Sequence, residues 1–133
     1  RKTEDRRRSP PMILAATVLE PPQGDKFWQF HFINDSDETV ESVTVEQVDY
    51  EWGDWSNIER VDATFGPVPP RASIDLVQET DTEVRTSLTL RVRAPSGKRR
   101  VVAEFGKLYA SRGPRVPIPI LDRLGKVASL EVL

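Results

Sequence analysis

The sequence predicts an all-β fold, an antiparallel β-sandwich of about seven short strands. Apolar and polar residues alternate through much of the chain, which is the pattern of strands with one buried face. Polar or Pro/Gly turns separate these runs at intervals of roughly 8–15 residues, a spacing typical of sandwiches rather than of βαβ units. At 133 residues, the chain has the length of one ordinary domain.

The first strand is predicted over the apolar run Met12–Leu19, which two prolines precede. This run is far shorter than the ~18–20 residues that a membrane-spanning helix needs, so we expect no membrane segment within this chain. Residues 1–11 carry five basic and two acidic residues and no apolar anchor, which predicts a flexible basic arm. Such an arm is also typical of the cytoplasmic flank of a spanning helix, so an anchor upstream of Arg1 is compatible with this start.

The second strand is predicted over residues 27–33, where large aromatic residues share one face: Trp28, Phe30 and Phe32. His31 falls on the opposite face, so we expect it to be an ordinary exposed strand residue. Residues 34–39 are rich in Asp, Ser and Asn, which bond their own backbone in turns, and therefore form a connecting loop.

Residues 40–52 alternate less regularly, because Val43 and Val45 share one face whereas Val48, Tyr50 and Trp52 share the other. This change of phase near residues 46–47 predicts a β-bulge in the third strand.

Four further stretches predict strands. One lies over residues 61–65 and a short one over residues 74–76, and the proline-rich residues 66–70 between them should break strand pairing. Residues 88–92 and 101–105 alternate on either side of a turn at residues 95–98, which predicts a hairpin. The predicted core therefore contains Trp28, Phe30, Phe32, Val43, Leu88, Leu90, Val92, Val101, Ala103 and Phe105.

The C-terminal part from about residue 112 is predicted to be an irregular, proline-rich extension of a single domain that spans residues 12–133. Prolines alternate with apolar residues up to Pro119, which favours an extended segment. Residues 120–133 fit a helical stripe and a strand equally well, and Gly125 weakens the helix.

Two segments, residues 32–45 and 65–74, resemble the second-to-third strand and the proline-led fifth strand of immunoglobulin-like and fibronectin-III-like sandwiches. This resemblance implies an immunoglobulin-like architecture over about two thirds of the chain. It implies no active residues, because such sandwiches carry many unrelated functions.

Charge is segregated along the chain. Residues 35–62 contain ten acidic residues and one basic residue, whereas residues 85–123 contain ten basic and two acidic residues. We expect the arginines of the predicted hairpin to face acidic side chains of the third strand across one sheet. With a pI near 5.5 and no recognised stacking motif, we expect no nucleic-acid partner.

Few residues offer catalytic chemistry. The chain has no Cys and one His, which excludes thiolate chemistry and leaves one centre for a histidine-based triad. We therefore predict no catalytic residues, no cofactor and no metal site. The alternative enzyme class is a carboxylate- or metal-dependent hydrolase centred on Asp49, Glu51 and Asp54.

The densest unusual feature is a cluster of rings and carboxylates over residues 49–55, and its predicted binding residues are Tyr50, Trp52, Asp54 and Trp55. Large rigid rings beside negative charge suit basic or apolar partners. We therefore expect a non-catalytic protein-interaction or scaffolding domain that binds a protein or peptide. A carbohydrate-binding module is the second choice, because exposed rings also stack on sugars. In the competing interpretation, Tyr50 and Trp52 cap the core and Trp55 covers a loop.

Overall fold

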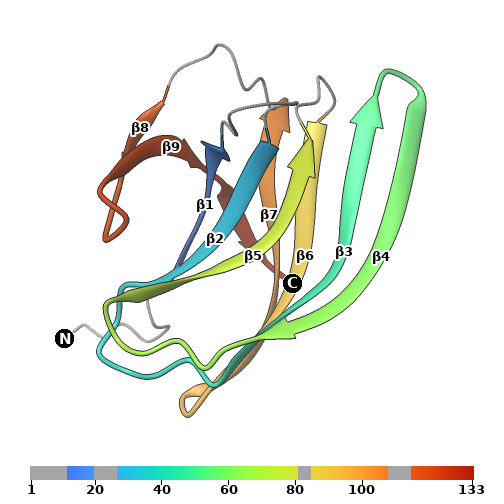
Figure 1. The fold of residues 1–133 in the computed structure, drawn as a ribbon. Helices are drawn as coiled ribbons and strands as arrows, with labels where there is room; N and C mark the ends of the chain where they lie inside the picture. The colour runs from blue at the N-terminus through green and yellow to red at the C-terminus, as the bar shows by residue number, and fades with distance from the viewer. Residues whose placement is uncertain (1–11, 20–26, 81–84, 108–114) are drawn as a thin grey trace, which may run out of the picture.

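The computed structural model describes residues 12–19, 27–80, 85–107 and 115–133. These residues form two antiparallel β-sheets, with strand orders β5-β2-β1-β9-β8 and β10-β7-β6-β3-β4 (Figure 1). The predicted all-β sandwich is therefore confirmed, with ten described strands instead of about seven. The strands are β1 (Met12–Leu19), β2 (Phe27–Asn34), β3 (Ser42–Trp52), β4 (Trp55–Phe65), β5 (Ala72–Thr80), β6 (Arg85–Ala94), β7 (Gly97–Lys107), β8 (Val116–Ile118), β9 (Arg123–Val127) and β10 (Ser129–Val132).

The predicted flexible arm, residues 1–11, lies outside the described residues. Within the described part of the chain, no helix is long and apolar enough to cross a membrane.

The core lies between the facing sheets and is built by the alternation that the sequence displays. Side chains of β2 contribute the largest rings, and the Phe30 ring centroid lies 5.1 Å from that of Phe105 on β7. All ten predicted core residues belong to this cluster, nine of them buried and Phe105 partly buried. The face of each of these strands was therefore predicted correctly.

The predicted bulge is present in β3. Its pairing shifts between Val45 and Gln47 against both neighbours, β4 and β6. Val43 and Val45 are buried before the shift and Val48 after it. The extra residue therefore lets the apolar side chains on both sides of the bulge reach the same core.

The proline-rich loop at residues 66–70 pairs once, although the sequence predicted a break. The Val40 and Val68 amides each donate to the other's carbonyl oxygen, at 2.9 and 2.8 Å. Unlike the prolines on either side of it, Val68 has an amide hydrogen, and its apolar side chain is buried. It can therefore both pair and enter the core.

The C-terminal segment is more regular than predicted, and the helical alternative for residues 120–133 is wrong. Strand β9 pairs with β8 and β1, while β10 pairs with β7. The segment thus adds strands to both sheets, and Ala128 between β9 and β10 is buried. Ile118 of β8 packs on Ile33, whose side chain points away from the main core.

Candidate functional site

The aromatic hairpin, residues 50–55 at the β3–β4 turn, contains every residue predicted to bind a partner. Trp52 pairs with Trp55, and Gly53 and Asp54 form the two-residue turn between them. Gly53 has a φ of 58°, in the left-handed region that glycine tolerates and that two-residue hairpin turns require. The local sequence therefore places the two indoles directly opposite each other.

Both indoles are open to solvent. Trp52 is 61% exposed and Trp55 is 49% exposed, whereas the partly buried Tyr50 packs against the core. Tyr50 therefore caps the core, as the competing interpretation expects. Trp52 and Trp55 contradict that interpretation, because both are exposed. Two adjacent, solvent-exposed tryptophans are unusual on a protein surface and are typical of binding sites.

The surroundings of the rings are acidic. Residues 49–59 contain four acidic residues and no basic one. Glu51, Asp54 and Glu59 are exposed, and Asp49 accepts a hydrogen bond from Gln47 Nε2 at 3.1 Å. The nearest basic side chain along the strand, Arg60, lies 3.7 Å from Asp62. Asp49 and Glu51 lie on the opposite face of β3 from Trp52, where Glu51 pairs with Arg85, so the carboxylates nearest the rings are those of Asp54 in the turn and Glu59 on β4.

Strand β4 is an outer strand of its sheet, and its residues 55–60 are all exposed. Such a strand presents backbone donors and acceptors that a further strand can pair with. Its pairing with β3 shifts register next to Asp62, whose φ is 50°. Such irregularities bend a strand. The part of β4 that is open to pairing with a further strand is therefore the part that begins at Trp55 and ends before this shift.

The carboxylates of the hydrolase alternative do not meet at one point. Asp49 and Glu51 line a shallow depression of about 210 Å³ together with Arg85 and Glu104, while Asp54 lies in the turn. In the described part of the chain, no group of three or more acidic or His side chains is placed to hold a metal ion.

The structure reveals a pair between a buried His and an exposed Asp that the sequence analysis missed. His31 was expected to be exposed, and this expectation is wrong, because only 3% of its side chain is accessible. Its Nδ1 lies 2.9 Å from Asp75 Oδ1 on the neighbouring strand β5. Burial lowers the pKa of His31, and the hydrogen bond to Asp75 opposes this effect only in part. The one sequence signal for this pair is the acidic residue Asp75, at the position of β5 that pairs with His31.

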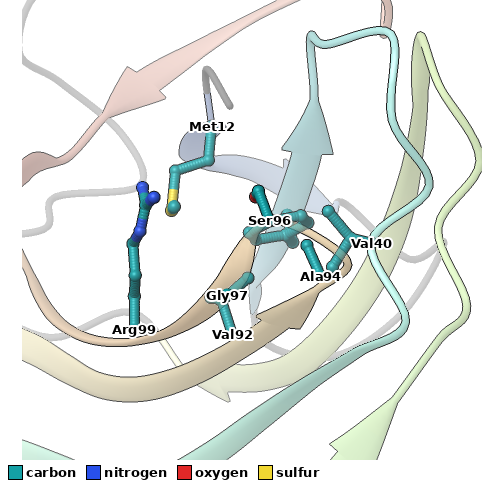
Figure 2. Close-up of a pocket in the computed structure, with 8 residues that line it drawn as sticks. Met12, Val40, Val92, Ala94, Ser96, Gly97 and Arg99 are labelled. Carbon is teal, nitrogen blue, oxygen red and sulfur yellow. The ribbon is translucent and has the colours of Figure 1, made fainter. Parts of the chain in front are cut away.

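A small cavity lies between the sheets near the β6–β7 turn. Its lining is mostly apolar and includes Met12, Val40, Val92 and Ala94, with the Arg99 side chain beside Met12 (Figure 2). Its volume of about 10 Å³ is at most enough for one water molecule. This cavity is therefore no substrate or cofactor site.

Comparisons with protein-family models, with curated proteins and with solved structures returned no match to this chain. The candidate site therefore rests on the geometry of the aromatic hairpin.

Proposed function

We propose that this chain is a non-catalytic protein-interaction domain whose aromatic hairpin binds a basic or apolar segment of a partner protein. The observation that carries the proposal is the exposure of Trp52 and Trp55 as a directly opposed pair at the end of a hairpin. Tryptophans supply large contact areas at small entropic cost and are enriched among residues that dominate binding energy.

The surroundings of the pair support an extended, basic peptide as the ligand. The exposed edge of β4 offers backbone groups for an added strand, and the neighbouring carboxylates attract Lys or Arg side chains. The same negative charge repels phosphates, which disfavours a nucleic acid at this hairpin. Cation–π contacts to the indoles would reinforce the preference for basic side chains.

We further propose that the architecture is immunoglobulin-like or fibronectin-III-like. In support, β1, β2 and β5 share one sheet while β3, β6 and β7 share the other. This division matches the A, B and E strands and the C, F and G strands of immunoglobulin-type sandwiches. Strand β4 pairs with β3 in the second sheet. The architecture by itself assigns no partner.

The experiment is selection of a peptide library against the protein, followed by titration of the selected peptides. We expect selected peptides to be rich in Lys, Arg and aromatic residues, and their binding to weaken as salt screens the charges. Trp52→Ala and Trp55→Ala should each abolish binding and leave thermal stability nearly unchanged, because both side chains are exposed. The control is Leu124→Ala, which removes another exposed apolar side chain. Full binding by both tryptophan variants would refute the proposal.

A glycan is the second candidate ligand, because the two exposed indoles could also stack on sugar rings. The two ligands separate on a glycan array. A hit that Trp55→Ala removes, and that salt does not weaken, would favour a carbohydrate-binding module.

A further inference from the structure

The outer face of the second sheet carries four cations in a compact grid where β6 meets β7. Arg93 pairs directly with Lys98, and Arg91 pairs directly with Arg100. Like charges at directly opposed positions of an antiparallel pair destabilise a sheet. Two such pairs follow one another here, so this arrangement opposes folding unless anions compensate for it.

The protein's own carboxylates compensate for only part of this charge. The Glu46 side chain is 14% exposed, and its two oxygens each lie 3.0 Å from a guanidinium nitrogen, Arg91 Nε and Arg100 Nη2. Glu41 lies 3.5 Å from Arg93 Nε. Among the described residues, Lys98 has no ion-pair partner. Two carboxylates therefore face four cations, and the grid keeps a net positive charge.

These cations surround an open depression of about 410 Å³, which we call the basic depression. Ser42 and Thr44 of β3 line one side and supply hydroxyl groups, and the Thr44 hydroxyl also lies 2.9 Å from that of Thr64. Arg99 borders the depression as well, but it pairs with the buried Val92 and its side chain lies beside Met12 between the sheets (Figure 2), so it adds no cation to this face. The volume is that of a small-ligand site. The β6–β7 turn lies at the opposite end of the sheet from the aromatic hairpin (Figure 1).

We propose that the basic depression binds a small ligand that carries phosphoryl groups. Guanidinium groups present forked donors that match phosphate oxygens, and Glu46 already holds two of these groups in place. A phosphoryl group brings about two negative charges and several acceptors, which suits two surplus cations and two hydroxyls. Binding would also relieve the repulsion between the opposed cations. The proposal is independent of the aromatic hairpin and of its partner.

The test is calorimetric titration with tripolyphosphate in physiological salt. The double variant Arg93→Gln/Lys98→Gln removes two cations and leaves both ion pairs of Glu46 intact. We expect it to bind tripolyphosphate about tenfold more weakly or worse, because it loses charge-assisted hydrogen bonds. Its thermal midpoint without ligand should stay close to that of the wild type, since one like-charged pair is gone and the lost Arg93–Glu41 ion pair is exposed. The matched control is Arg60→Gln, which removes an exposed arginine of the same sheet outside the depression.

Two further arms identify the source of the phosphoryl group. Vesicles of phosphatidylcholine with and without a phosphatidylinositol bisphosphate test a lipid headgroup, and binding that requires the phosphorylated lipid and Lys98 would support the proposal. A single-stranded oligonucleotide tests a polymer, and tighter, length-dependent binding to it would overturn the assignment of a small ligand. Absence of binding to tripolyphosphate and to both kinds of vesicle would overturn the proposal, as would equal loss of affinity in the Arg60→Gln control.

Discussion

Phe30 is fully buried between the two sheets, and its ring is tilted by 50° against that of Phe105. Phe30→Ala would leave a cavity among side chains from several strands, and we expect it to lower the free energy of unfolding by roughly 3–5 kcal/mol. This loss approaches the whole stability of a small domain. Urea denaturation measures it, with Phe30→Leu as a milder comparison. A neutral Phe30→Ala would show that this face of β2 does not form the core.

His31 makes stability depend on pH. Burial lowers its pKa from the ordinary value near 6.5, so in the intermediate pH range the unfolded chain binds more protons than the folded one. The contribution of the neutral His31 to stability is fully present above about pH 6.5. It is lost as the pH falls through that value toward the pKa of His31 in the folded protein. Urea midpoints at pH 7.5 and 5.0 should therefore differ less in His31→Gln than in the wild type. An equal difference in both proteins would assign the pH dependence to other groups.

At the scale of the element, Gly53 determines the conformation of the β3–β4 turn. A Cβ atom at this position would meet nothing within 4 Å, so only the positive φ opposes substitution. We expect Gly53→Ala to lower stability by about 1 kcal/mol, measured by denaturation, and to weaken binding at the opposed indoles. Gly53→Asn should be milder, because Asn tolerates the left-handed region. Identical losses in both variants would contradict this explanation.

The C-terminal strands determine the integrity of the whole molecule. They cover Ile33 and pair with β1 in one sheet and β7 in the other. A chain that ends at residue 107 would expose these strand edges and Ile33, and exposed edges template association. We expect this truncated protein to bind a hydrophobic dye and to elute from size exclusion as aggregates. A stable, monodisperse truncated protein would show that the C-terminal strands are dispensable.

Much of the architecture follows from local patterns. The faces of β2, β6 and β7 and the bulge of β3 were predicted, because alternation and its change of phase are visible within ten residues. The first half of β4 was missed, because its residues 55–60 are exposed on both faces and show no alternation. The cluster of Tyr50, Trp52 and Trp55 was visible as composition, but the sequence could not separate a ring that caps the core from rings that face solvent.

By itself, the sequence determined the all-β class, the inward faces of the central strands and the position of the aromatic cluster, because each depends on contacts between residues that are near in the chain. Tertiary structure alone decided two features. It paired β9 and β10 with strands of opposite sheets, and it buried His31 beside Asp75. Each depends on the register between separate strands, which is fixed only when the whole sandwich has assembled its core.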